Sequence, residues 1–162
     1  MKDITYIHEH MTIDLSGVKN NIDCKLNDFE KTKKELLRLK ELGVTRIVDV
    51  TNMGMGRNVE FITRLEKETG IEILMSTGYY KEPFFPKEVE KLSIEKLEEK
   101  LINDIKIGID GTNKKATFIG EIGTGFEKMT SLEEKVIIVA SRVQKKTGKC
   151  WSIRLDRWIK QT

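Results

Sequence analysis

Apolar and polar residues alternate along this chain in two regular ways. Short runs rich in valine, isoleucine and threonine have the character of β-strands. Each is followed by a longer segment whose apolar residues recur every three or four positions, as they do on one face of a helix. The predicted strands are 4–8, 44–50, 71–76 and 116–122, and the predicted helices are 29–42, 58–69, 93–108 and 131–147.

Residues with capping preferences lie at the ends of the predicted helices. Asn27 and Asp28 offer an N-cap to the first helix, and Ser93 offers one to the third. Short polar side chains at this position accept hydrogen bonds from the free N–H groups of the first turn. Gly43 and Gly70 follow the first two helices, where a glycine ends a helix most easily.

A strand followed by a helix, four times over, predicts a parallel sheet of the α/β class. Two architectures fit this pattern: a small doubly wound sheet, or the N-terminal half of a TIM (β/α)8 barrel with about four βα units. A complete barrel typically needs about 250 residues. The 162 residues of this chain would therefore form about half of a barrel around one core.

Composition and charge exclude several classes of protein. The net charge is only +3, and the basic residues are interleaved with acidic ones along the predicted helices, so we expect no nucleic-acid partner. No run approaches the ~20 apolar residues of a membrane span, and the N-terminus lacks an apolar signal segment. We therefore expect a cytoplasmic protein with Cys24 and Cys150 as free thiols.

The two histidines of the chain, His8 and His10, lie at the end of the first predicted strand. Residues i and i+2 of a strand project to the same face, so both imidazoles would point toward one place, with Glu9 between them on the other face. Neutral imidazole is a common ligand of zinc. Two histidines are too few for a catalytic metal site, so further ligands must come from elsewhere in the fold.

Glu121 is an acidic residue inside an otherwise apolar strand, between Gly120 and Gly123. A buried carboxylate is costly unless it is paired or binds a metal. By itself it could be a strand-end glutamate that is partly solvated or paired with a basic residue. Together with the histidine pair, we interpret it as a metal ligand.

Other strand ends carry weaker signals. Gly54 and Gly56 precede a helix, where backbone N–H groups could bind phosphate, but two such glycines are a weak signal and we favour a tight turn. Arg57 could hold an anionic substrate or lie on the surface. Tyr79 and Tyr80 could line a pocket or pack in the core.

Several of these segments together resemble the phosphotriesterase family of the amidohydrolase superfamily, and most closely its branch of phosphotriesterase homology proteins. The resemblance extends from about residue 4 to residue 148, with its motifs in matching order and spacing. The segments that carry it are 8–10, 51–58, 76–80, 84–86, 108–112 and 120–124.

The resemblance implies a (β/α)8 barrel with two divalent metals, usually zinc, at the carboxyl ends of the strands. His8 and His10 match the ligands of the more buried metal, and Glu121 matches the bridging ligand. The implied activity is hydrolysis of a small-molecule ester, lactone or phosphoester by metal-bound hydroxide. Tyr80 and Arg57 are the residues that we predict to contact the substrate.

The chain also departs from the family. The family supplies further histidines from its fifth and sixth strands and an aspartate from its eighth, and these are absent here. We therefore predict a partial metal-dependent hydrolase over residues 1–148, followed by a foreign tail over 149–162 in a truncated and impaired gene product.

Two alternatives stay open. One is a non-catalytic half-barrel whose exposed sheet edges self-associate or pair with a separate C-terminal half. The other is an α/β module that binds an anion at the Gly54–Gly56 loop.

Overall fold

The computed structural model describes residues 3–126 and 128–154, and one parallel sheet is its main feature. Five strands lie in the order β1, β4, β5, β6, β7, and each pairs in parallel with the next. The bounds are β1 Ile4–Glu9, β4 Val44–Asp49, β5 Glu72–Thr77, β6 Phe118–Gly123 and β7 Trp151–Arg154.

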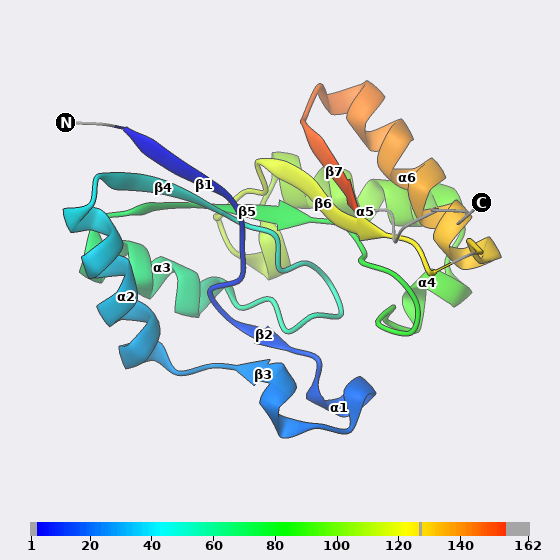
Figure 1. The fold of residues 1–162 in the computed structure, drawn as a ribbon. Helices are drawn as coiled ribbons and strands as arrows, with labels where there is room; N and C mark the ends of the chain where they lie inside the picture. Colours follow the sequence, from blue (N-terminus) through cyan, green and yellow to red (C-terminus); the bar gives the residue numbers. More distant parts are fainter. Residues whose placement is uncertain (1–2, 127, 155–162) are drawn as a thin grey trace, which may run out of the picture.

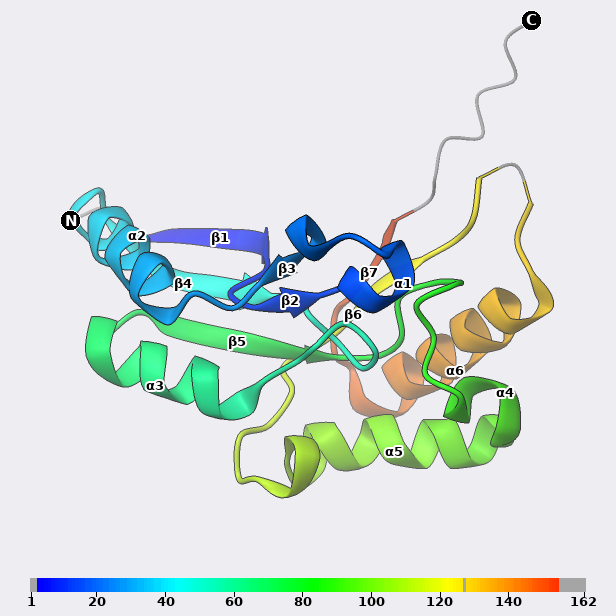
Figure 2. The same ribbon diagram turned by 90° about the horizontal axis from the view of Figure 1, so that it is seen from below.

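The order of the strands decides between the two predicted architectures. In a doubly wound sheet the strand order reverses at a switch point. Here the order follows the chain from the first strand to the last, as it does in a barrel. The sheet curls into a half-barrel (Figures 1 and 2), which confirms the predicted fold. Because the strands are parallel, their carboxyl ends share one edge of the sheet.

The four predicted helices are present, and each begins at a side chain that caps it. Asp28, Asn58, Ser93 and Thr130 each accept a hydrogen bond from a backbone N–H of the first turn. None of the helices in the described part of the chain is long and apolar enough to cross a membrane. Their bounds are α2 Phe29–Glu41, α3 Val59–Thr69, α5 Ile94–Lys106 and α6 Ser131–Thr147.

The core lies between the sheet and these helices. Helix α2 packs on β4 and α3, whereas α5 packs on β5 and on α6. In Figure 2, α3 and α5 run along the same side of the sheet. Ile47 and Ile73 are paired in register on β4 and β5, and both are fully buried, as is Val139 of α6. Burial of one such side chain contributes about 1.5–3 kcal/mol.

Several short elements were not predicted, because two to four residues are too few to show a period. Strands β2 and β3 form a small antiparallel hairpin after β1. The backbone N–H of Asp14 in this hairpin donates to the carbonyl of Met55 in the loop after β4. The short elements are β2 Ile13–Asp14, α1 Ser16–Lys19, η1 Ile22–Cys24, β3 Lys25–Leu26, α4 Glu88–Lys91 and η2 Ile109–Gly111.

Strand β7 lies in the segment that we predicted to be foreign to the fold. It adds a fifth strand beside β6 and was missed because its alternation, Trp151 and Ile153, covers only two apolar positions. Residues 155–162 lie outside the described part of the chain. The foreign origin of the tail stays a prediction.

Candidate metal centre

His8 and His10 lie where β1 ends, at the carboxyl edge of the sheet. Their side chains are 41% and 26% exposed, and the rings meet edge to face with centroids 6.0 Å apart. The two-residue period of a strand accounts for this shared direction. Both imidazoles therefore face one space that remains accessible to solvent.

Glu121, in the middle of β6, completes the cluster. Its carboxylate oxygen Oε2 lies 3.2 Å from Nε2 of His8 and 3.7 Å from Nε2 of His10. The three candidate ligand atoms all lie within 4.8 Å of one another. Strands β1 and β6 are not neighbours in the sheet, because β4 and β5 lie between them. In a flat sheet their ends would therefore be far apart. The curl of the sheet is what brings the two strand ends together.

The electrostatics of the cluster favour an ionised Glu121. The residue is 1% exposed, and burial by itself would raise the pKa of its carboxyl group. A hydrogen bond from His10 and the charges of His8 and Arg154 outweigh burial, so the pKa is lowered from its ordinary value. The carboxylate is therefore available as an anionic ligand at neutral pH.

Backbone and amide contacts fix Glu121 in place. The side-chain amide of Asn52 donates to the carbonyl of Glu121 at 2.7 Å, and Asn52 is itself fully buried. The backbone N–H of Glu121 reaches the carbonyl of Val50 at 3.4 Å. The loop after β4 thus holds the main chain of β6 across the interior of the sheet. The side-chain oxygen Oδ1 of Asn52 is buried and has no hydrogen-bond partner among the described residues, which leaves an acceptor beside the cluster.

Asp49 ties the loop after β1 to the end of β4. It is 1% exposed and accepts hydrogen bonds from the backbone N–H groups of Met11 and Thr51, at 2.9 and 2.8 Å. Burial raises the pKa of its carboxyl group, and these two N–H groups partly offset that rise. The hydroxyl of Thr51 in turn contacts Nδ1 of His10 at 2.8 Å. Asp49, to which sequence analysis assigned no role, therefore helps to position His10 through Thr51.

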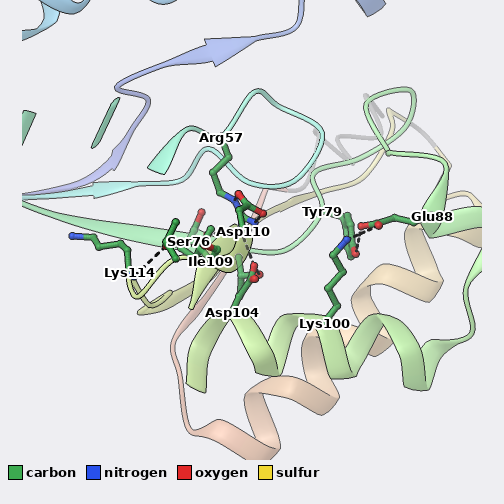
Figure 3. A network of polar contacts seen from close by, with 11 residues as sticks. Arg57, Ser76, Tyr79, Glu88, Lys100, Asp104, Ile109, Asp110 and Lys114 are labelled. Carbon is green, nitrogen blue, oxygen red and sulfur yellow. Dashed lines mark hydrogen bonds and ion pairs between the residues drawn. The ribbon is translucent and has the colours of Figure 1, made fainter. Parts of the chain in front are cut away.

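Arg57 forms a buried ion-pair network, and its contact with a substrate stays a prediction. Its side chain is 3% exposed and forms ion pairs with Asp104 at 2.8 Å and Asp110 at 2.7 Å (Figure 3). Burial lowers the pKa of the guanidinium, but the two carboxylates outweigh burial and raise it. Asp104 also accepts from the hydroxyl of Thr77. Arg57 therefore joins the loop after β4 to α5 and η2.

The two tyrosines of the loop after β5 have different environments. Tyr79 is fully buried, and its hydroxyl donates to Glu88, which also binds Lys100 (Figure 3). Tyr80 is half-buried and stacks on Phe84 with ring centroids 5.5 Å apart. Tyr79 is thus a packing residue, whereas Tyr80 is partly open to solvent.

The ring of Tyr80 also borders the end of β6. A Cβ atom built on Gly123 would lie 2.8 Å from Cε2 of Tyr80, so the ring lies directly against this glycine. Gly123 is two residues beyond Glu121. The ring of Tyr80 therefore lies close to the metal cluster, which is compatible with the substrate contact that we predicted for it.

The structure gives the glycines before α3 a packing reason. Both have positive φ, 89° at Gly54 and 82° at Gly56. A Cβ on Gly54 would lie 2.5 Å from the carbonyl oxygen of Phe84, and one on Gly56 would lie 2.8 Å from the backbone nitrogen of Asp14. These values agree with the tight turn that we favoured for this segment, because neighbouring backbone fills the space beside both glycines.

Arg154 at the end of β7 is a site residue that sequence reasoning missed. Its Nη1 lies 3.5 Å from Oε1 of Glu121. The available signal was Gly148 at the end of a predicted helix, after which a further strand would continue the βα repeat.

Comparison with known proteins agrees with this geometry. A family model described as the phosphotriesterase family matches residues 2–160. The chain is 44% identical over 145 residues to the phosphotriesterase homology protein of Escherichia coli, covering 90% of this chain and 50% of that protein. It is 36% identical over 151 residues to the aryldialkylphosphatase of Saccharolobus solfataricus, covering 90% and 48%.

The likeness extends to three dimensions. A crystal structure of the Escherichia coli phosphotriesterase homology protein with phosphate in its active site superposes with a TM-score of 0.92 at 42% identity. The match covers 95% of this chain and 53% of that one. The chain thus spans about half the length of these two curated relatives.

Proposed function

The chain belongs to the phosphotriesterase family, and from this we propose that it carries part of the metal centre of a hydrolase that cleaves ester-like bonds. The observation behind the proposal is the convergence of His8, His10 and Glu121, whose candidate ligand atoms lie within 4.8 Å of one another. The substrate class that we propose is a small molecule with a phosphoester, lactone or carboxylic ester bond.

The donor set fits a divalent transition metal. Two imidazoles and one carboxylate are ligands that suit zinc, and Oε2 of Glu121 is the oxygen that faces both rings. When bound, the cation would lower the pKa of a coordinated water and polarise the scissile bond. We therefore propose zinc as the cofactor and these three residues as its protein ligands.

The surrounding residues hold the ligands in this arrangement before any metal binds. Asn52 fixes the backbone of Glu121, and Thr51 fixes the ring of His10. Second-layer hydrogen bonds of this kind orient ligands and raise metal affinity. Tyr80, beside the end of β6, is our candidate for the substrate contact.

This chain by itself provides few ligands. It contains two histidines in 162 residues, so no more imidazoles are available than the two in the cluster. A catalytic site usually has three protein ligands for each metal, so the cluster suffices for one metal and not for the two that the family resemblance implies. We therefore expect zinc binding from the isolated chain, but little turnover.

Metal titration tests the proposal. We expect the metal-free chain to bind Zn²⁺ in isothermal titration calorimetry and Glu121→Gln to weaken binding by at least tenfold, an order-of-magnitude estimate for the loss of an anionic ligand. Glu9→Gln is the matched control, because Glu9 immediately follows His8 but is not part of the ligand cluster. Equal zinc binding by Glu121→Gln and the unaltered chain would contradict the proposal. Assays with an aryl phosphotriester, a lactone and an aryl ester then measure turnover.

A second candidate function is a non-catalytic half-barrel that associates with a copy of itself or with a separate C-terminal half. Among the described strands, β1 and β7 each have one neighbour, so one edge of each is open. Tyr6 and Ile7 on β1 are 38% and 74% exposed. A cavity of about 550 Å³ lies between β1 and α2, lined in part by Tyr6, Leu36 and Leu39.

Open sheet edges with exposed apolar side chains favour association. Size-exclusion chromatography with light scattering distinguishes the two candidates. A concentration-dependent dimer that persists after His8→Ala and His10→Ala would favour the non-catalytic role, and a monomer at high concentration would exclude self-association.

A further inference from the structure

We propose that this chain holds a single divalent cation at the cluster, because the guanidinium of Arg154 faces the second oxygen of the Glu121 carboxylate. The inference rests on the proposed function, since it concerns the same ligands. It adds the number of cations and the residue that limits it.

The two oxygens of Glu121 have different partners. Oε2 faces Nε2 of both His8 and His10, at 3.2 and 3.7 Å. Oε1 faces Nη1 of Arg154 at 3.5 Å. A carboxylate that bridges two cations offers one oxygen to each of them. Here one oxygen faces ligands for a cation, and the other faces a side chain that is already positively charged.

The pairing of β7 with β6 determines where Arg154 lies. Arg154 is in register with Gly123, and its carbonyl accepts a hydrogen bond from the backbone N–H of Thr124 at 3.3 Å. The two strands approach closely, since a Cβ on Gly120 would lie 2.7 Å from the carbonyl oxygen of Ser152. The position of the arginine therefore follows from main-chain pairing, although its side chain is 61% exposed.

A guanidinium differs from a protonated lysine or histidine in that it keeps its charge at every working pH. Its charge repels a second dication at Oε1 and also weakens the attraction of Glu121 for the first. No fourth His, Cys, Asp or Glu joins the three-residue group within the described residues, so a second cation would find no other such ligand there. Arg154 thus takes the place of a second cation beside Oε1 of Glu121.

Zinc titration of the full chain and three variants tests the inference. Arg154→Met removes the charge and keeps an extended side chain, whereas Arg154→Lys keeps the charge. Arg142→Met is the control, because it removes the same charge from α6, where Arg142 pairs with Glu95 and Glu98. Calorimetry with Zn²⁺ gives the stoichiometry and the dissociation constant, and circular dichroism confirms that each variant is folded.

We expect one equivalent of zinc in the unaltered chain. For Arg154→Met we expect the dissociation constant to fall roughly threefold to tenfold, the effect of removing one solvent-screened charge a few ångströms from the carboxylate. Arg154→Lys and Arg142→Met should stay within about twofold of the unaltered chain, because the local charge is kept in the first and distant in the second.

Two outcomes would overturn the inference while leaving the proposed function intact. One is binding of two zinc equivalents by the unaltered chain, and the other is an unchanged dissociation constant in folded Arg154→Met. Absence of zinc binding in every variant is a different result, because it would overturn the proposed metal centre itself.

Discussion

Nδ1 of His10 donates its hydrogen bond to the hydroxyl of Thr51, 2.8 Å away. The direction follows from the next contact, in which the same hydroxyl donates its only proton to the carbonyl of Thr12 at 3.0 Å. With Nδ1 of His10 holding a proton toward Thr51, Nε2 is the nitrogen that faces Glu121 and that a metal would bind. One threonine thus selects the tautomer in which His10 can bind a metal.

We predict that Thr51→Val weakens zinc binding by about 10- to 100-fold, because valine keeps the shape of threonine but cannot accept the proton of Nδ1. Thr51→Ser keeps the hydroxyl and should bind zinc nearly as tightly as the unaltered chain. Competition with a chromophoric chelator measures the affinity, and the ¹⁵N shifts of the His10 ring report the tautomer. An unchanged ring spectrum in Thr51→Val would show that the hydroxyl does not select the tautomer.

The buried ion pair of Arg57 gives a prediction about stability. Arg57→Leu leaves the buried carboxylate of Asp104 without its partner, so we expect the free energy of unfolding to fall by about 3–5 kcal/mol. The control is Arg46→Leu, because Arg46 pairs with Glu72 at the surface and such pairs contribute about 1 kcal/mol or less. Urea denaturation measures both values. Similar losses in the two variants would contradict the structural role of Arg57.

Gly54→Ala tests the tight turn before α3. The new Cβ would meet the carbonyl oxygen of Phe84, and the positive φ adds backbone strain, so we expect a loss of about 2–4 kcal/mol in the free energy of unfolding. Gly17→Ala is the matched control, because Gly17 lies in α1 with no atom within 4 Å of its built Cβ. Thermal unfolding should separate the two variants clearly. A neutral effect of Gly54→Ala would mean that this backbone can adjust.

Acid should loosen the β2–β3 hairpin at low pH. Hydrogen bonds from Lys25 and Ser16 lower the pKa of Asp14 to about 2 from its ordinary 3.8. A carboxyl group whose pKa is depressed by folding stabilises the fold above its unfolded pKa, and this contribution disappears as the pH falls through the folded value. The stabilisation should therefore be complete above about pH 4 and lost toward pH 2.

The measurement for this prediction is the titration of the Asp14 carboxyl group by NMR. In Lys25→Met the midpoint should move up toward 3.8, because the largest cause of the depression is removed. Ser16→Ala should produce a smaller shift in the same direction. An identical midpoint in Lys25→Met and the unaltered chain would contradict the ion pair.

The regular elements and most of the cluster could be predicted because local signals encode them. Helices α2 and α5 begin at the predicted caps Asp28 and Ser93, since capping depends on residues within one turn. The strand period put His8 and His10 on one face, and the cost of burying a charge singled out Glu121. The very short β2 and β3 could not be predicted, because two residues show no period.

Local signals say little about side chains that meet across the fold. Arg57 looks the same in the sequence whether it binds a substrate or pairs with Asp104, which is 47 positions away. Arg154 has no pattern that links it to Glu121, yet the register of β7 on β6 places the two side chains together.

The sequence by itself therefore determined the four long helices, four of the five strands of the sheet, the α/β class and the identity of three candidate ligands, since propensity, capping and periodicity act within a few residues. Only the tertiary structure decided the order of the strands, the tautomer of His10 and the sharing of the Glu121 carboxylate between the histidines and Arg154. These features depend on strand pairing and sheet curvature, which join residues that are far apart in the chain.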